Sequence, residues 1–379
     1  MYEIKKLNPI SDLIYNNLDK ANYRVTDDAT DPVGILVRSA AMHEYPINPS
    51  LLAVARAGAG VNNIPLPKMA DAGVVVFNTP GANANAVKEL VICALLLSCR
   101  DVLGGVAFAG GLKGKEDAAK QVESGKKAFV GPEIFGKTLG VVGLGAIGAL
   151  VTKAALALGM KVVGYDPFFT AEKAKSISEE LVFTTDLDVL YAASDFITLH
   201  VPFTDATRGM INADSIAKMK NGVRIVNCAR GELVDNEAIL SALEAGKVKK
   251  YVTDFPMPAV IGVSDKIVTI PHLGASTPEA EDNCAVMASA ELKDYIENGN
   301  IKNSVNCPNL SLERKGAVRV TVLTREANAE ETIKKALGVE IAASKRGDLT
   351  YAIADLDKAP ADETVAAIAA NALKVRVIR

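Results

Sequence analysis

Residues 139–166 read LGVVGLGAIGALVTKAALALGMKVVGYD, and this stretch decides the fold. An apolar run leads into the glycine pattern GLGAIG at residues 143–148, after which the spacing predicts a helix over residues 149–158. A second apolar run, residues 161–165, ends at Asp166. Strand, glycine turn, helix and strand in this order are typical of a βαβ unit that binds a dinucleotide.

Each part of the pattern has a physical role in such a site. Gly143, Gly145 and Gly148 allow a tight turn, close approach of a pyrophosphate and close helix–strand packing, and the helix N-terminus offers amides and a positive dipole to the phosphates. Ala146 and Ile147, within the same pattern, are predicted to bind the cofactor as well. Asp166 can accept hydrogen bonds from both ribose hydroxyls and would repel a 2′-phosphate, which favours NAD over NADP. A plain structural turn is the alternative, but the flanking strand and helix favour the cofactor site.

A second phosphate-binding pattern is rejected. Residues 131–138, GPEIFGKT, match the loop of nucleoside triphosphatases letter for letter. That loop must follow a strand and lead into a helix, whereas this stretch leads into a predicted strand. The match therefore does not indicate a triphosphate site.

The composition is that of a globular protein with two or three domains. The chain has 379 residues, of which 49% are hydrophobic and 23% charged, with a formal net charge of −3. We expect no nucleic-acid or membrane partner, because the chain lacks a basic field and its longest apolar run, residues 90–99, is short. Five scattered cysteines favour reduced thiols over disulfides or a metal site, and with the polar start of the chain they favour a cytoplasmic location.

Alternation of strand-like and helix-like stretches predicts an α/β fold with two doubly wound parallel sheets, each Rossmann-like. The first alternation fills the first hundred residues, and the second runs from residue 137 to about 271. Between them, the Gly- and Lys-rich residues 101–136 are interpreted as a functional arm or an interface. Residues 316–379 read β-α-β-β-α-β, the order of a small ferredoxin-like domain.

Two residues after predicted strands suit chemistry at a hydroxy-acid carbon. Arg230 follows the strand at residues 223–228 and could clamp a carboxylate and polarise a carbonyl, although a solvated loop arginine is the alternative. His272 follows the strand at residues 266–270, and imidazole exchanges a proton near neutral pH. His200 also ends a predicted strand and is interpreted as a cofactor-side or packing histidine.

Three motifs, GLGAIG (143–148), NCARGELVDNEAI (227–239) and PHLGAST (271–277), resemble those of the D-isomer-specific 2-hydroxyacid dehydrogenases. Residues 36–40 and 56–64 are similar to the branch of that family that acts on 3-phosphoglycerate. The resemblance implies NAD-dependent oxidation of D-3-phosphoglycerate to 3-phosphohydroxypyruvate, the first step of serine biosynthesis, by hydride transfer from C2.

The resemblance also implies the domain organisation. The substrate-binding domain would comprise residues 1–98 and 284–308, the NAD-binding domain residues 99–283, and an ACT-like domain residues 316–379. The family further suggests a homodimer or tetramer, in which Lys126 or Lys127 reaches a neighbouring subunit's site.

Residue roles follow from the same resemblance. Arg230 would hold the substrate carboxylate and carbonyl, and His272 would take the C2 hydroxyl proton. Arg38 and Arg56 would grip the substrate phosphate. The other substrate-binding residues implied are Ala59, Gly60, Val61 and Asn62, and the further cofactor-binding residues are Pro167, His200, Val201, Pro202, Thr207, Cys228, Ala229, Asp254 and Gly274, together with Arg230 and His272.

Two departures from the family pattern stand out. No Glu lies between Glu244 and Glu279, where the family places the carboxylate that bonds the catalytic histidine. Either Asp254 serves both that histidine and the nicotinamide amide or His272 works without a carboxylate partner; we favour Asp254 as the nicotinamide contact. In the ACT-like region, residues 324–329 lack the Pro and Gly of a serine-binding turn, so we expect weak or absent serine feedback.

Two other functions remain open at this point. The first is a glyoxylate or hydroxypyruvate reductase, which would be indifferent to the loss of Arg38 and Arg56. The second is a non-enzymatic NAD(H)-sensing protein on the same scaffold, which would bind NADH tightly and turn over no hydroxy or keto acid.

Overall fold

The computed structural model describes the whole chain, residues 1–379, and it divides into two compact units. The first unit joins residues 1–83 to residues 278–379, and the second is residues 84–277. The predicted domain limits at 98/99 and 283/284 fall inside helices α2 (Ala84–Cys99) and α10 (Pro278–Asn298). The roles of the predicted domains stay a prediction.

A seven-stranded parallel sheet forms the second unit, in the order β12-β11-β10-β9-β6-β7-β8. The chain runs outward from β6 through β7 and β8 and then returns to β9 on the other side of β6, so the strand order reverses between β6 and β9. Ligands of open α/β sheets bind beyond the carboxyl ends of the strands at such a reversal. The strands are β6 (Thr138–Val142), β7 (Lys161–Tyr165), β8 (Val182–Thr184), β9 (Phe196–Leu199), β10 (Val223–Asn227), β11 (Val248–Thr253) and β12 (Ile267–Thr269).

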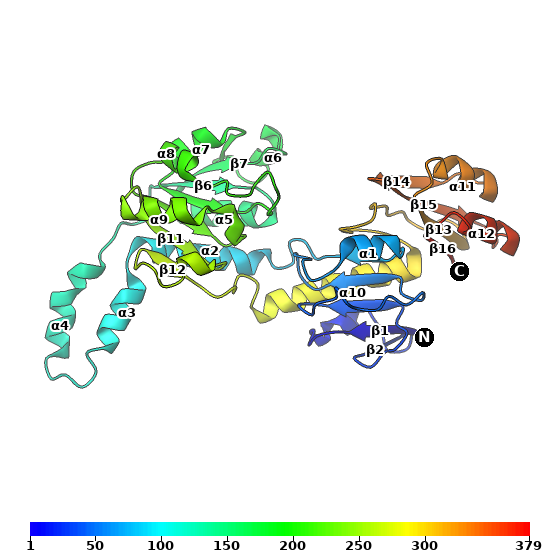
Figure 1. Cartoon of the computed structure of the whole chain (residues 1–379), viewed down its shortest axis with the longest axis horizontal. Coiled ribbons are helices and arrows are strands. Elements are labelled where there is room, and N and C mark those ends of the chain that lie inside the picture. Colours follow the sequence, from blue (N-terminus) through cyan, green and yellow to red (C-terminus); the bar gives the residue numbers. More distant parts are fainter. The chain divides into compact units, whose positions relative to one another are not determined.

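Helices cover both faces of this sheet (Figure 1). Consecutive residues of β6 show the two faces, because side chains alternate along a strand. Val141 joins the apolar cluster under α2 and α5, whereas Val142 joins the cluster under α7, α8 and α9. Burial on both faces explains why these strands are continuous apolar runs. The helices are α2, α5 (Ala146–Ala157), α6 (Ala171–Lys175), α7 (Leu187–Ala193), α8 (Ala213–Lys218) and α9 (Asn236–Glu244), with the short turns η3 (Gly231–Leu233) and η4 (Pro258–Val260).

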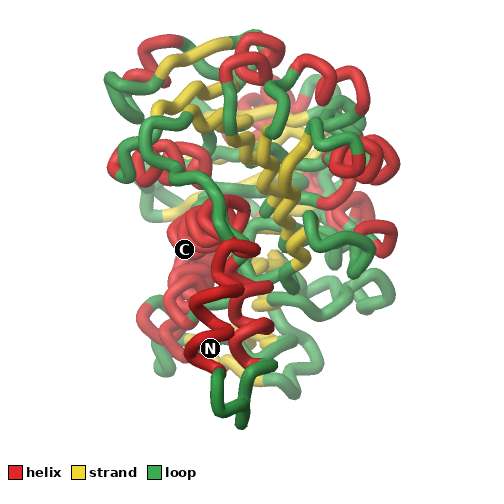
Figure 2. Tube along the Cα trace, turned by 90° about the vertical axis from the view of Figure 1, so that its left-hand side faces the viewer, coloured by secondary structure: helices red, strands yellow, loops and turns green.

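The predicted arm is helical rather than irregular. It contains α3 (Val102–Gly110), α4 (Ala118–Gly125) and the 3-10 turn η2 (Lys126–Phe129), none of which has a buried residue. Figures 1 and 2 show α3 and α4 side by side, projecting from the second unit. An aromatic contact joins α3 to η2, with 5.4 Å between the ring centroids of Phe108 and Phe129. Gly-rich composition concealed these helices, because their stability comes from packing rather than propensity.

No single helix of the structure has the length and apolar character needed to cross a membrane. Helices α2 and α3 taken together pass on length and composition alone, with a bend of 71° between them.

The first unit contains a five-stranded parallel sheet in the order β2-β1-β3-β4-β5. Helix α10 and the 3-10 turn η1 (Asp12–Asn16) pack on one face of it, and α1 (Leu66–Asp71) lies against β5. Leu36 and Ala55 face the α10 side, whereas Ile35, Val37 and Val54 face the other side. The strands are β1 (Tyr2–Lys6), β2 (Tyr23–Thr26), β3 (Gly34–Val37), β4 (Ala53–Arg56) and β5 (Val75–Phe77).

The C-terminal region has the predicted β-α-β-β-α-β order and an antiparallel sheet, β14-β15-β13-β16. One sheet face packs on α11 and α12 through a cluster that includes Val322 and Ile333. The other face contributes Leu323 and Tyr351 to the core of α10. This sheet is therefore buried on both sides within the first unit. Its elements are β13 (Val318–Thr324), α11 (Ala329–Leu337), β14 (Ala342–Arg346), β15 (Leu349–Leu356), α12 (Asp362–Ala369) and β16 (Lys374–Ile378).

A fully buried arginine joins this sheet to α10. Arg319 pairs with Asp355 through two nitrogens, Nε at 2.7 Å and Nη2 at 2.9 Å. Its Nη1 donates to the carbonyls of Asn298 and Leu312. Burial of a guanidinium is tolerated here because each of its nitrogens is hydrogen-bonded.

Replacing Arg319 by Ala should destabilise the first unit strongly, since it leaves Asp355 without its cation. Removal of one partner of a buried ion pair costs about 3–5 kcal/mol. The matched control is Arg24→Ala, because Arg24 pairs with Glu3 at the exposed edge and such pairs are worth about 0–1 kcal/mol. Urea unfolding followed by circular dichroism measures the free energy of unfolding of both variants. Equal losses in the two variants would show that the buried ion pair of Arg319 contributes no more than the exposed pair of Arg24.

Candidate cofactor and substrate sites

The turn after β6 brings the strand-order reversal and the glycine pattern together. The Gly143 amide donates to the carbonyl of Tyr165 at 2.8 Å, and its φ of 93° lies in the left-handed region that favours glycine. A Cβ at this position would lie 2.6 Å from the carbonyl oxygen of His200, the residue that follows β9. Only glycine allows the ends of β6 and β9 to approach in this way.

The other two glycines differ in their surroundings. A Cβ on Gly148 would lie 1.9 Å from the Gly143 carbonyl oxygen, so the first turn of α5 packs directly on the loop. A Cβ on Gly145 would meet nothing within 4 Å. Gly145 is also the N-cap of α5, and no side chain caps the helix there. Open space in front of uncapped helix amides fits an anionic pyrophosphate.

Asp166, at the end of β7, is held in place by two amides. Its Oδ2 accepts from Leu144 N at 3.0 Å and its Oδ1 accepts from Phe168 N at 2.9 Å. The carboxylate is thereby tied to the glycine loop itself, with 8% of the residue exposed. Pro167 follows directly in the turn between β7 and α6.

His200 has the environment of a neutral, buried imidazole. Its Nε2 lies 3.0 Å from Thr198 Oγ1, and its buried Nδ1 makes no hydrogen bond within the chain. Burial lowers the pKa of His200 to about 3. This ring is therefore uncharged near neutral pH and does not exchange protons there.

Val201, Pro202 and Thr207 lie in the loop that follows β9. Thr207 Oγ1 donates to the Pro202 carbonyl at 2.7 Å and accepts from the Thr204 amide at 2.9 Å. These bonds fold the loop into a compact turn, and Val201 lies against Gly143.

Arg230 and His272 contact the same aromatic ring. The guanidinium carbon of Arg230 lies 5.0 Å from the ring centroid of Phe255, and the His272 ring centroid lies 4.0 Å from it at a 46° tilt. The Arg230 carbonyl accepts from Asn227 Nδ2 at 2.8 Å, which fixes the backbone after β10. Phe255 therefore sets the spacing of the cation and the imidazole, a role that sequence reasoning missed; its only signal was its place beside Asp254.

Asp254, after β11, is a buried carboxylate with one oxygen that accepts no hydrogen bond from the chain. Its Oδ2 accepts from the Gly274 amide at 3.1 Å, whereas its buried Oδ1 has no hydrogen bond of normal geometry. Burial raises the pKa of Asp254 to about 6, against the opposing effects of Gly274, Arg230 and Cys228. An unpaired buried oxygen fits an amide donor such as that of a nicotinamide.

Cys228 and Ala229 occupy the turn between β10 and Arg230. The Cys228 thiol is buried close to Asp254, and burial raises its pKa above the ordinary value. Cys228 is therefore a neutral packing group at this edge of the sheet.

The predicted substrate residues belong to the first unit, at the carboxyl ends of β3 and β4. Arg56 Nε donates to the Arg38 carbonyl at 3.1 Å. The Arg56 guanidinium folds over Gly58, where a Cβ would lie 2.1 Å from it. Glu281, in the first turn of α10, pairs with Arg38 at 2.7 Å. Sequence reasoning missed Glu281, because helix α10 is far from β3 in the chain.

The loop of Ala59, Gly60, Val61 and Asn62 follows Gly58 directly. Asn78 Nδ2 donates to the Ala59 carbonyl at 2.6 Å, and the Asn62 carbonyl lies 3.1 Å from His43 Nε2. Lys126 and Lys127 lie in η2 of the arm, in the second unit, and both are exposed.

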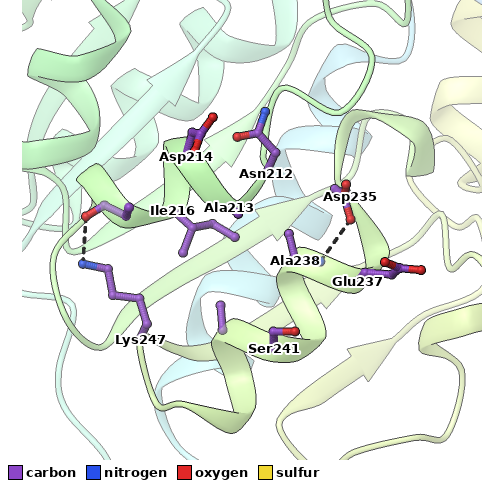
Figure 3. Close-up of a pocket in the computed structure, with 11 residues that line it drawn as sticks. Asn212, Ala213, Asp214, Ile216, Asp235, Glu237, Ala238, Ser241 and Lys247 are labelled. Atoms are coloured by element: carbon purple, nitrogen blue, oxygen red, sulfur yellow. Dashed lines mark hydrogen bonds between the residues drawn. The ribbon is translucent and has the colours of Figure 1, made fainter.

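A groove of about 610 Å³ between α8 and α9 contains none of the predicted residues. Two of its polar side chains bond to the helices themselves (Figure 3): Asp235 caps α9 at Ala238 N, 3.0 Å, and Lys247 Nζ donates to the Ala217 carbonyl at 3.2 Å. The groove is a seam between two helices rather than the nucleotide site.

Comparison with known proteins agrees with this geometry. Residues 107–274 match the family model for the D-isomer specific 2-hydroxyacid dehydrogenase, NAD binding domain. Hydroxypyruvate reductase of Thermotoga maritima is 42% identical over 242 residues, which cover 61% of this chain and 73% of that protein. The chain belongs to the D-isomer-specific 2-hydroxyacid dehydrogenase family. Its second unit therefore carries the family's NAD-binding domain, and the cofactor is NAD.

Other members of the family are similar over most of this chain. D-3-phosphoglycerate dehydrogenase of Methanocaldococcus jannaschii is 37% identical over 281 residues, which cover 73% of this chain and 51% of that protein. The chain thus spans about half the length of the curated phosphoglycerate dehydrogenases it matches. The NAD+-bound 3-phosphoglycerate dehydrogenase of Entamoeba histolytica has a TM-score of 0.62 and 27% identity, with 80% of this chain and 98% of that chain covered.

Two glycine variants separate folding from cofactor binding. Gly145→Ala should leave the free energy of unfolding almost unchanged, because the new methyl group meets nothing, yet it should weaken NADH binding by filling the space before α5. Gly148→Ala should destabilise the second unit, since its methyl group collides with the Gly143 carbonyl. Calorimetric NADH titration and thermal unfolding of both variants measure these effects. Normal NADH affinity in Gly145→Ala would place the pyrophosphate elsewhere.

Stability should depend on pH through Asp254. Its pKa in the folded chain, about 6, lies above the ordinary 3.8, so the folded state binds more protons between these values. The free energy of unfolding therefore falls as pH rises from about 4 to 6, by about 2–3 kcal/mol from this group. Asp254→Asn should remove that part of the pH dependence in urea titrations without NAD. An unchanged pH profile in the variant would contradict the burial argument.

Proposed function

We propose that this protein is an NAD-dependent D-3-phosphoglycerate dehydrogenase, which oxidises C2 of its substrate to give 3-phosphohydroxypyruvate. The assignment as a dehydrogenase rests on the contact of Arg230 and His272 with one ring, Phe255, beside the buried carboxylate of Asp254. Two arginines at neighbouring strand ends of the first unit, Arg38 and Arg56, favour a phosphorylated substrate. The phosphoglycerate dehydrogenases among the relatives support the same choice.

Bound NAD supplies the acceptor for the hydride that leaves C2, and the chain's own residues do the rest. Removal of the hydride turns the C2 hydroxyl into a carbonyl, and its proton must leave at the same time. The imidazole of His272 accepts that proton. The guanidinium of Arg230 stabilises charge on the forming carbonyl oxygen and binds the carboxylate beside it.

In this proposal the loops after β6, β7, β9 and β11 contact the cofactor. The first turn of α5 faces the pyrophosphate, and Asp166 accepts from the adenosine ribose, which excludes a 2′-phosphate. Asp254 Oδ1 accepts from the carboxamide of the nicotinamide, which orients the ring. Since such a donor favours the charged carboxylate, cofactor binding should lower the pKa of Asp254.

In this proposal Arg38 and Arg56 bind the phosphate, and the amides of residues 59–61 bind the substrate carboxylate. Guanidinium groups bind phosphate oxygens through two donors at once, which gives both strength and direction. The arginines lie at the ends of adjacent paired strands, because Val37 pairs with Arg56 in the parallel register.

We further propose a homodimer or tetramer, with the arm as the subunit contact. Helix α3 exposes Val102, Leu103 and Val106, which are 47%, 50% and 66% exposed. An apolar helix that nothing covers in the monomer is suited to burial against a second copy.

The C-terminal region is proposed to be ACT-like. Activity that serine leaves unaltered would agree with the lack of Pro and Gly in the turn at residues 324–329.

A hydroxypyruvate or glyoxylate reductase is the second candidate, favoured by the 42% identity with the Thermotoga maritima enzyme. The two candidates share the roles of Arg230 and His272 and differ in whether the phosphate matters. An NAD(H)-sensing protein would bind NADH and turn over neither substrate.

His272→Ala should lower kcat for 3-phosphoglycerate oxidation by about 10²–10⁴-fold, because a positioned proton acceptor contributes that much. Arg230→Ala should lower kcat by about 10²–10³-fold through loss of charge stabilisation. NADH affinity, measured by titration, should survive in His272→Ala. The control is His43→Ala, whose imidazole lies exposed in a loop of the first unit. Equal activity in all of these proteins would exclude the proposed chemistry.

Arg38→Ala distinguishes the two enzymatic candidates. Loss of a charge-assisted contact of about 1.5–3 kcal/mol should raise the KM for 3-phosphoglycerate by about 10–150-fold. The KM for unphosphorylated hydroxypyruvate should hardly change. Arg24→Ala serves as the control. If Arg38→Ala affects neither substrate and hydroxypyruvate is the better one, the reductase assignment holds instead.

A further inference from the structure

Arg38, which is proposed to bind the substrate phosphate, is already paired with an anionic side chain, Glu281. Glu281 Oε1 lies 2.7 Å from Arg38 Nη2, within hydrogen-bonding distance. The two side chains are 42% and 35% exposed, so water reaches both. The pair lies where the carboxyl end of β3 meets the first turn of α10.

The backbone around Arg38 is held firmly, which leaves its guanidinium as the adjustable part. Asn8 Oδ1 accepts from the amides of Arg38, Ser39 and Ala40, each at 3.0 Å. The carbonyl of Arg38 accepts from Arg56 Nε. None of these contacts uses the Arg38 guanidinium, whose partner in the structure is Glu281.

Three charges converge at this point. The buried thiol of Cys284 responds to all of them: burial raises its pKa, Arg56 and Arg38 oppose that change, and Glu281 reinforces it. The carboxylate of Glu281 therefore lowers the positive charge that a phosphate monoester, with its charge of about −1.5 to −2, would meet at Arg38.

Helix stabilisation does not account for the position of Glu281. Both Glu279 and Glu281 lie in the first turn of α10, where a negative charge favours the helix dipole. Glu279 provides that effect while exposed to solvent and without an ion pair. The ion pair with Arg38 is thus an additional property of Glu281.

We propose that Glu281 competes with the phosphate of the substrate for Arg38 and so limits the preference of this protein for phosphorylated over unphosphorylated hydroxy acids. This inference rests on the proposed function. A partly exposed ion pair is worth about 0–1 kcal/mol, so a phosphate, which binds guanidinium through two oxygens, can displace it. Competition for the same donors and repulsion between carboxylate and phosphate act in the same direction. Glu281 is a specificity-determining residue that acts through Arg38.

The test is Glu281→Gln, which keeps the shape of the side chain and removes its charge. The KM for 3-phosphoglycerate should fall about threefold to tenfold, the equivalent of the ion pair and its repulsion. Its kcat and the KM for unphosphorylated hydroxypyruvate should stay unchanged. Glu279→Gln, with the same loss of charge in the same turn, should change neither KM. In an Arg38→Ala background, Glu281→Gln should have no effect.

An unchanged or raised KM for 3-phosphoglycerate in Glu281→Gln would overturn the proposal, because Glu281 would then be inert or would help to place Arg38. A chain that does not oxidise 3-phosphoglycerate is a failure of the proposed function instead. In that case the probe is inorganic phosphate as an inhibitor of hydroxypyruvate reduction. Stronger inhibition of Glu281→Gln than of the unaltered protein supports the competition, and equal inhibition overturns it.

Discussion

The loop after β6 is the constraint on which the second unit depends. Gly143 donates to the β7 strand end, and its backbone packs on the carbonyl of His200 after β9. In addition, the amide of His200 donates to Val142 at the end of β6. These contacts tie together the three strands around the order reversal, so the same atoms that hold the sheet ends also line the cofactor edge. A side chain at Gly143 would separate the strands and fill the site at once.

A comparable dependence joins the two sheets of the first unit. The C-terminal sheet buries one face on its own helices and gives the other to the core of α10, with Arg319 bonded across the junction. A sheet covered on both faces has little freedom to move as a separate body. Helix α10 thereby packs against both sheets, and it carries Glu281 in its first turn and the buried Cys284 one turn further on.

Much of the fold could be predicted from local pattern. Largely apolar runs located β6, β7, β9 and β10, and the order of the C-terminal elements was predicted correctly. Three kinds of element escaped. Strand β1, Tyr2–Lys6, reads YEIKK with Ile4 as its one buried residue, and β8 has only three residues. Residues Asp12–Asn16 form only a short 3-10 turn, η1, in a stretch that also contains Pro9 and Asn17. Helix α3 is in contact with η2 through Phe108 and Phe129, and sequence spacing does not disclose such a contact.

For the sites, the sequence by itself determined which chemical groups are present. The glycines, Asp166, Arg230, His272 and the two arginines of the first unit follow from separate short motifs, each recognised within its own segment of the chain. Only the tertiary structure decided how these groups are tuned. It placed Asp254 and His200 in surroundings that exclude water and so moved their pKa values in opposite directions, and it placed Phe255 in contact with both Arg230 and His272. It also brought Glu281 to Arg38 across more than two hundred residues of chain. Burial and pairing of this kind depend on which elements pack together, whereas a motif records only what its own segment contains.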